Sequence, residues 1–144
     1  MTIARLQNYA LGEWVAGTGA QATLLHAVTG EPVAETSSGG LDFGEMVRYA
    51  RRVGGPALRQ RTFHERAAML KAVAKHLMER KEAFYALSAA TGATRADSWV
   101  DIEGGAGTLF AYASMGSNEL PSGNLIHEGP AFPLGKKGGF AGTH

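Results

Sequence analysis

Apolar residues recur with helical spacing in the middle of the chain, between residues 62 and 114. Thr62 and Glu65 form a capping box, in which each side chain pairs with a backbone amide that the helix start leaves unpaired. Four apolar residues then follow the i, i+3, i+4, i+7 spacing of a helix with one buried face: Leu70, Val73, Ala74 and Leu77. The pattern predicts a helix that begins after Thr62 and packs its apolar stripe on a core.

Two more helices are predicted on either side of this one. Asp42 is suited to cap a helix with Glu45 in its first turn, and Gly54-Gly55-Pro56 is a typical helix end. Beyond the central helix, residues 81–90 continue the helical pattern. Gly92 then suits the left-handed turn that commonly ends a helix.

A fourth helix is predicted from Thr94 to about Gly116. Thr94 and Asp97 form a second capping box, and an apolar stripe follows over nearly four turns: Trp99, Ile102, Ala106, Leu109, Phe110 and Ala113. Three glycines interrupt the helix, each at a cost of about 1 kcal/mol relative to alanine: Gly104, Gly105 and Gly107. Either a neighbouring backbone packs closely against them, or the helix wall is kept clear for a ligand.

The remaining sequence predicts short strands and turns. Residues 8–10 and 13–16 flank Leu11-Gly12, which indicates a tight hairpin, and residues 23–28 form another apolar run. The chain therefore divides into strands and turns at 1–40, a helical block at 41–116 and a tail rich in glycine and proline at 121–144. Within that tail, residues 125–127 are a strand candidate.

Composition and charge exclude several classes of protein. The 144 residues carry a net charge of +1 without a long run of like charge, so a nucleic-acid partner has no support. No segment resembles a signal peptide or a membrane span, which predicts a cytoplasmic protein without membrane contact. The chain has no cysteine, which excludes disulfides, a cysteine-ligated zinc site and a catalytic thiol within these residues.

The candidate chemical groups all favour structural roles. The five histidines match no metal motif and are expected at surface and cap positions: His26, His64, His76, His127 and His144. Asp97, Asp101 and Glu103 are close enough in sequence to hold a cation, but a solvated helix face explains them better. Residues 135–139 lack the spacing of a phosphate loop. We therefore assign no catalytic, cofactor-binding or metal-binding residue from the motifs alone.

The order of these signals resembles the N-terminal part of the aldehyde dehydrogenase superfamily. The matching motifs are Gly-Glu-Trp at 12–14, Thr-Gly-Glu at 29–31, Glu-Arg-Ala at 65–67 and Leu-Phe-Ala-Tyr-Ala at 109–113. The resemblance implies an α/β fold of which this chain is the N-terminal segment, with short strands, four helices and the start of an oligomerisation β arm. Such a segment is expected to be incomplete as a domain.

A closer resemblance lies within that family. Residues 66–77, 90–105 and 107–114 are similar to the dehydrogenase half of the bifunctional ring-opening proteins of bacterial phenylacetate degradation. This similarity implies oxidation of a CoA-thioester semialdehyde to the acid with NADP or NAD. A semialdehyde dehydrogenase of the benzoyl-CoA pathway is the alternative within the family. A stand-alone helical interaction module without enzymatic activity is the alternative outside it.

The resemblance also implies which functions this chain would and would not carry. The family's catalytic cysteine, general-base glutamate, oxyanion asparagine and cofactor loops all belong to sequence other than these residues, so the chain alone is expected to be inactive and to hold no cofactor. Val100 and Gly104 correspond to positions that face the aldehyde tunnel. The remainder of the dehydrogenase domain is the expected partner, and the β arm is expected to pair subunits into a homo-oligomer.

Overall fold

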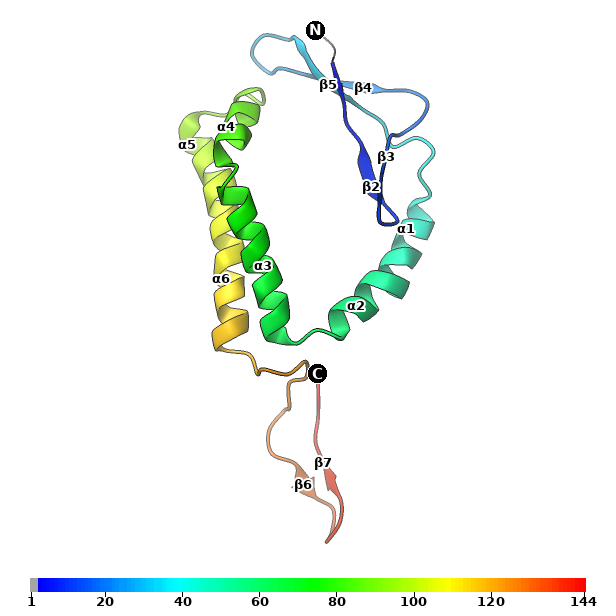
Figure 1. Ribbon diagram of the computed structural model, residues 1–144, viewed down its shortest axis with the longest axis vertical. Helices are drawn as coiled ribbons and strands as arrows, with labels where there is room; N and C mark the ends of the chain where they lie inside the picture. Colours follow the sequence, from blue (N-terminus) through cyan, green and yellow to red (C-terminus); the bar gives the residue numbers. More distant parts are fainter. Residues whose placement is uncertain (1–2) are drawn as a thin grey trace.

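The computed structural model describes residues 3–144, in which short strands, a helical block and a terminal hairpin follow one another along the chain (Figure 1). A small sheet and a hairpin at the N-terminal end lead into helices α1 and α2. The chain then turns back along a long helix pair formed by α3 and α6. The last residues extend away from the end of that pair as a separate hairpin.

The N-terminal region contains a three-stranded sheet and a separate hairpin. β5 (Pro32–Thr36) lies between β1 (Ala4–Arg5), to which it is parallel, and β4 (Ala22–Leu25), to which it is antiparallel. β2 (Asn8–Ala10) and β3 (Glu13–Val15) form the predicted hairpin.

The turn of this hairpin has positive φ at both of its residues, 56° at Leu11 and 92° at Gly12. That geometry matches the twist of the two strands. The strand predicted at 23–28 ends at Leu25, because the backbone turns at His26, and sequence patterning did not predict β1 or β5.

The prediction that Gly54-Gly55-Pro56 ends the first helix is wrong. The helix runs from α1 (Phe43–Tyr49) through a π-helical segment, η1 (Ala50–Gly54), into α2 (Gly55–Arg59). Both glycines have helical dihedral angles, and Pro56 follows within the same continuous helix, two residues after the end of the π-helical segment. At the other end, the Asp42 side chain caps α1 as predicted.

The central helices begin where the sequence predicts. In the capping box of α3 (Phe63–Met78), the Glu65 amide donates to Thr62 Oγ1 at 3.1 Å and the Thr62 amide donates to Glu65 Oε2 at 2.7 Å. α4 (Lys81–Ala89) follows after a short turn and ends before Gly92, which has the predicted left-handed φ of 85°.

The fourth predicted helix is one continuous rod made of three segments. α5 (Arg95–Trp99) begins at the Thr94–Asp97 capping box and passes through a second π-helical segment, η2 (Val100–Gly104), into α6 (Gly105–Asn118). α6 lies beside α3 and runs in the opposite direction (Figure 1). This pairing forms the main helical contact of the described residues.

The core of the helix pair is built from small side chains. Its buried residues are Ala67, Ala74, Ala106, Ala113 and Gly116. The predicted stripe of α3 is therefore only partly buried: Ala74 is fully inside, whereas Leu70 and Val73 are exposed. Close backbone approach, rather than large interdigitating side chains, brings the two helices together.

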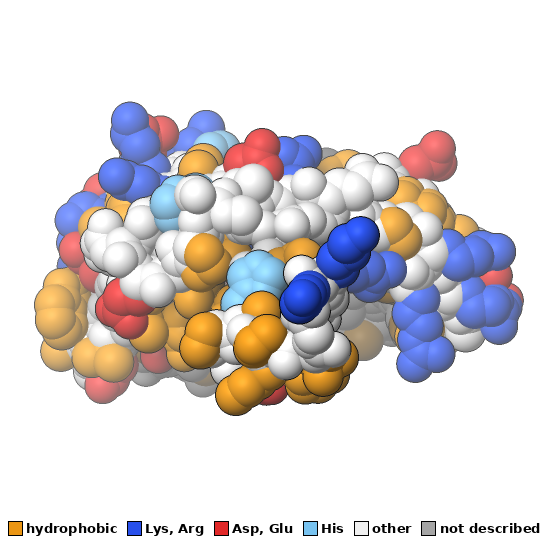
Figure 2. Space-filling model, turned by 90° about the horizontal axis from the view of Figure 1, so that it is seen from below, with side chains coloured by type: hydrophobic (Ala, Val, Ile, Leu, Met, Phe, Trp, Pro, Cys, Tyr) orange, Lys and Arg blue, Asp and Glu red, His pale blue; other side chains and the backbone are white. Residues whose placement is uncertain are grey.

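Large apolar side chains of the described residues lie mostly at the surface. Apart from Tyr85, every buried hydrophobic residue is an alanine. Hydrophobic side chains gather in several surface patches, as Figure 2 shows for one face. Trp14, Val28 and Leu134 are among the most exposed. None of the helices in residues 3–144 has the length and apolar character needed to cross a membrane.

The C-terminal segment is a hairpin rather than the single strand predicted at 125–127. β6 (Phe132–Pro133) pairs with β7 (Gly139–Phe140), and backbone hydrogen bonds between Ile126 and His144 extend the pairing toward the base. Residues 134–138 form the loop that joins these two strands. The hairpin projects beyond the helices (Figure 1).

Candidate functional site

Val100 and Gly104, the two predicted tunnel residues, both lie in η2 and both face away from the neighbouring helices. Val100 is 60% exposed, and a Cβ added at Gly104 would meet no atom within 4 Å. Being four residues apart, they lie next to each other along one side of the helix. We refer to these two residues as the outer strip of η2.

Gly105 and Gly107 do not pack closely against any other segment of residues 3–144. A Cβ at Gly105 or Gly107 would also meet nothing within 4 Å, so close packing against another segment of this chain does not explain them. The closely packed glycine is instead Gly116, where an added Cβ would lie 3.0 Å from the Cβ of Ala67. Gly104 and Gly107, three residues apart, therefore leave one side of the rod free of side chains, whereas Gly105 lines a small pocket with Leu77 and Phe84.

The inner side of the same rod is held by polar contacts with α4. Ser98 is only 2% exposed; its Oγ lies 2.8 Å from Ser88 Oγ and donates to the carbonyl of Thr94 at 2.9 Å. Five residues later, Glu103 Oε1 accepts from Tyr85 Oη at 2.7 Å and from Lys81 Nζ at 3.1 Å. These contacts join α4 to α5 and η2.

Further contacts enclose Tyr85. The Arg95 guanidinium lies 3.4 Å from the centre of the Tyr85 ring, a cation–π contact, and it also pairs with Glu82 at 3.3 Å. Sequence patterning did not predict this cluster, because Lys81 and Tyr85 lie in α4 whereas Glu103 lies in η2, and no periodicity links the two elements. The only sequence signal was a tyrosine at a position that the helical pattern left unexplained.

The hydrogen bonds of the cluster shift the pKa values of its two central groups. The pKa of Glu103 is lowered, first by the hydrogen bond from Tyr85 and then by that from Lys81. The pKa of Tyr85 is raised, first by burial of its hydroxyl and then by its bond to the Glu103 carboxylate. Both shifts favour the same pair, an ionised glutamate and a neutral tyrosine, near neutral pH.

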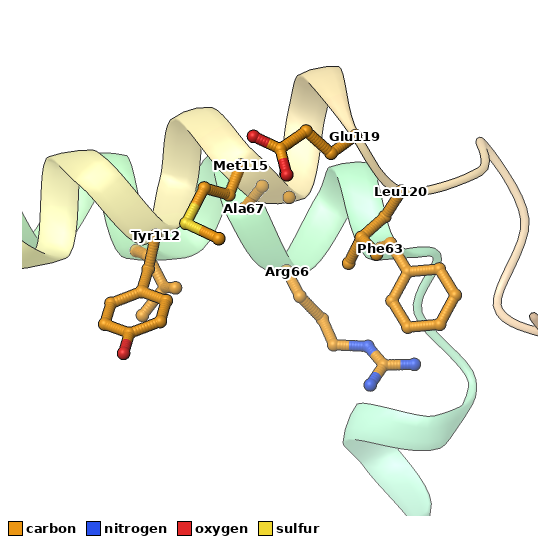
Figure 3. A pocket seen from close by; sticks show the side chains of 9 residues that line it. Phe63, Arg66, Ala67, Tyr112, Met115, Glu119 and Leu120 are labelled. Carbon is orange, nitrogen blue, oxygen red and sulfur yellow. The ribbon is translucent and has the colours of Figure 1, made fainter.

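A separate apolar groove lies at the other end of the helix pair. It has a volume of about 280 Å³ and is lined by Phe63, Arg66, Ala67, Leu70, Tyr112, Met115, Gly116, Glu119 and Leu120. Figure 3 shows these side chains coming from α3 and from the end of α6 around the short side chain of Ala67. The groove does not include Val100 or Gly104, and it contains no nucleophile paired with a base.

Four histidine side chains take part in local structural contacts. His26 Nδ1 accepts from the amides of Val28 and Thr29, and His64 Nε2 lies 3.2 Å from the carbonyl of Leu120. His76 contacts Arg80, and His144 contacts Glu128. These contacts agree with the predicted surface and cap roles.

Two of the three acidic residues of the fourth helix are likewise used by the fold. Asp97 belongs to the capping box of α5 and Glu103 to the cluster with α4, while Asp101 is exposed. Across residues 3–144, no group of three or more histidine or acidic side chains is arranged to hold a metal ion.

The sequence of this chain is similar to that of one enzyme family. The sequence profile of the aldehyde dehydrogenase family matches residues 14–130. A curated relative, the 3,4-dehydroadipyl-CoA semialdehyde dehydrogenase of Aromatoleum evansii, is 37% identical over 141 residues, which cover 97% of this chain. The same match covers 27% of the relative, so this chain spans about a quarter of that protein's length.

Proposed function

This chain belongs to the aldehyde dehydrogenase family, and from that premise we propose that it is the N-terminal segment of an NAD(P)-dependent enzyme that oxidises a CoA-thioester semialdehyde to the acid. The observation that carries the substrate class is the 37% identity to the Aromatoleum evansii relative across nearly the whole chain. We call the proposed dehydrogenase that contains these 144 residues the parent enzyme.

The catalytic groups of the parent enzyme would come from outside residues 1–144. The chain contains no cysteine, and family chemistry proceeds through a thiolate. Nor do residues 3–144 fit a dinucleotide: no G-x-G-x-x-G turn opens a helix, and the glycine-rich stretches at 17–19 and 135–139 each join two strands. NADP or NAD would therefore bind elsewhere in the parent enzyme.

An activity assay tests the two parts of this proposal. The parent enzyme should form reduced nicotinamide when supplied with 3,4-dehydroadipyl-CoA semialdehyde, and with a much lower kcat/KM when supplied with propanal. The purified 144-residue chain should form none with either substrate. Equal kcat/KM values for both aldehydes would contradict the substrate class, and turnover by the 144-residue chain would contradict the assignment of catalysis to other residues.

The identity of the CoA-linked semialdehyde, and with it the pathway, is a separate part of the proposal. The resemblance to the ring-opening proteins points to phenylacetate degradation, whereas the name of the Aromatoleum evansii relative specifies a 3,4-dehydroadipyl-CoA derivative. Comparing kcat/KM for that compound with kcat/KM for the semialdehyde released by the ring-opening reaction decides between the two, because the preferred CoA thioester should be turned over with the higher value.

We also propose that the outer strip of η2 lines the path of the substrate. The support is steric: Val100 is exposed, and no atom of the described chain lies where a side chain at Gly104 would begin. A wall without a side chain at Gly104 leaves room for a large CoA-linked substrate. In the parent enzyme, Gly104→Leu should raise KM for the CoA-linked semialdehyde by about tenfold, with a much smaller change for propanal.

Gly54 provides a matched control for this substitution. It is the last residue of η1 as Gly104 is the last residue of η2, and an added Cβ there also meets nothing within 4 Å. Gly54→Leu therefore introduces the same side chain at an equivalent backbone position and should leave both KM values unchanged. An equal rise for both substrates in Gly104→Leu would contradict the tunnel assignment.

The exposed apolar surfaces and the hairpin suggest the partners of this segment. We infer that the remainder of the dehydrogenase domain covers side chains such as Val47, Val73 and Leu87, which are half exposed or more here. The β6–β7 hairpin presents open strand edges and exposed Phe132 and Phe140, which suits pairing with a second copy. Replacing residues 132–140 by a short polar turn should lower the oligomeric mass of the parent enzyme in sedimentation, and an unchanged mass would contradict the role of the hairpin.

A further inference from the structure

The π-helical segment η2 is anchored at both of its ends. On its N-terminal side Ser98 is buried and bonded to Ser88, and on its C-terminal side Ala106 is buried, being 2% exposed. Val100 and Gly104 lie between these anchors on the free side of the rod. The contacts that hold the middle of η2 therefore determine how rigidly the outer strip is positioned.

Glu103 is the link between the middle of η2 and the rest of the structure. Within residues 3–144 it is the member of η2 whose side chain hydrogen-bonds to another helix. Both donors come from α4: Lys81 is its first residue, and Tyr85 follows one turn later. They converge on the same oxygen, Oε1, so the glutamate is drawn toward α4 while its neighbour Gly104 faces outward.

Tyr85 is the better-fixed of the two donors. It is only 6% exposed, and the Arg95 guanidinium lies against its ring at 3.4 Å. Lys81, in contrast, is a flexible side chain that is about one-third exposed. A tyrosine hydroxyl held by packing gives a directional contact, whereas an ammonium group acts as a point charge.

We propose that Tyr85 is a positioning residue for the substrate path: by holding Glu103 it fixes η2 and thereby the placement of Val100 and Gly104. The inference rests on the proposed function, because it matters for catalysis only if the outer strip faces the substrate. Tyr85 does not touch the substrate in this account. Its effect on the reaction passes entirely through the carboxylate of Glu103.

The test is Tyr85→Phe in the parent enzyme, since phenylalanine keeps the ring that packs under Arg95 and removes only the hydroxyl. Amide hydrogen exchange of residues 100–104 should accelerate about fivefold, because the middle of η2 loses its directional bond. KM for the CoA-linked semialdehyde should rise about fivefold, with kcat and the KM for propanal changed less than twofold. A loss of stability alone would not produce this dependence on substrate size.

Tyr9→Phe is the matched control. Tyr9 lies in the N-terminal hairpin, is 60% exposed, and its hydroxyl makes no hydrogen bond within the described part of the chain. Removing that hydroxyl should change neither the exchange nor either KM. Glu103→Gln is the second variant; it keeps a hydrogen-bond acceptor for Tyr85, so it should give a smaller shift than Tyr85→Phe in the same direction.

The two proposals fail in different ways. If Gly104→Leu shows no preference between large and small substrates, the assignment of the substrate path is wrong. If Gly104→Leu discriminates but Tyr85→Phe leaves the KM ratio at its wild-type value, the path is retained and the positioning role of Tyr85 is overturned. If Tyr85→Phe leaves the exchange of residues 100–104 unchanged, the positioning role is overturned in the same way.

Discussion

The chain contains two helices with the same irregularity and very different support. In residues 43–59 and again in residues 95–118, an α-helix passes through a five-residue π-helical segment whose last residue is a glycine, and a second glycine follows. In the first helix no residue of α1, η1 or α2 is buried. In the second, buried residues flank η2 on both sides and Glu103 is bonded to α4.

The difference shows that a π-helical segment has a fixed exposed side only where other helices hold it in place. The charged contacts of the first helix stay within it or at its cap: Glu45 pairs with Arg48 and Arg52. The second helix is fixed from outside by α3 and α4, so its free side has a set position. π-helical segments are often found at functional sites, and on this comparison only the second is held firmly enough to line a substrate path.

The largest effect that would test this contrast is expected at Gly116. Because a Cβ there already approaches Ala67 to 3.0 Å, Gly116→Leu should push α6 from α3 and destabilise the pair by about 3 kcal/mol. Gly54→Ala, in the unsupported helix, should instead stabilise by up to about 1 kcal/mol, since an open helical glycine gains from alanine. Hydrogen exchange rates of the two helices in the parent enzyme measure both changes in stability. Similar effects of the two substitutions would contradict the difference in support between the helices.

A smaller effect is expected at Ser98. Ser98→Ala removes a buried hydroxyl that bonds to Ser88 and should destabilise the contact between α4 and α5 by about 1 kcal/mol. Arg52→Ala, which removes an exposed ion pair within the first helix, should have less effect, because exposed pairs contribute little. Thermal inactivation of the parent enzyme ranks the two, and a larger loss for Arg52→Ala would contradict the comparison.

The smallest effect concerns pH. The pKa values of Glu45 and Glu103 are both lowered by hydrogen bonds, from Arg48 and from Tyr85 respectively. Each therefore contributes stability above the unfolded value of about 4.3, and that contribution is lost as the pH falls through the lowered folded value.

High salt should distinguish the two glutamates. Salt should weaken the exposed Glu45 pairs, whereas the neutral hydroxyl of Tyr85 should keep its bond to Glu103. Exchange rates of residues 44–52 and 100–104, measured between pH 6 and pH 3 at low and high salt, test this. Equal salt sensitivity in the two segments would contradict it.

Sequence patterning predicted the local elements well where the signal is local. Both capping boxes, the first hairpin and the left-handed glycine at 92 are confirmed, because each depends on residues within a few positions of one another. β1 was missed because a two-residue strand has no periodicity to detect. Gly54-Gly55-Pro56 was misinterpreted because both glycines, which usually end a helix, here have helical dihedral angles and continue it.

The candidate site shows a similar limit. Motif order was sufficient to find the family, and the tunnel assignment of Val100 and Gly104 stays a prediction. Motif order did not find the cluster around Tyr85, whose members lie up to 22 residues apart. Periodicity also could not show which glycines pack closely: Gly116 does, while the three that interrupt the apolar stripe do not. Which glycines pack closely depends on the contacts between helices, and the residue pattern of one helix does not determine those contacts.

The central claim is that this chain is a supporting segment of a dehydrogenase domain rather than an autonomous interaction module. Unfolding of the purified 144-residue chain, followed by circular dichroism together with binding of an apolar dye, tests it most directly. We predict strong dye binding and a gradual loss of helix, because most large apolar side chains are exposed. A compact monomer that binds no dye and unfolds in one sharp cooperative transition would contradict the claim.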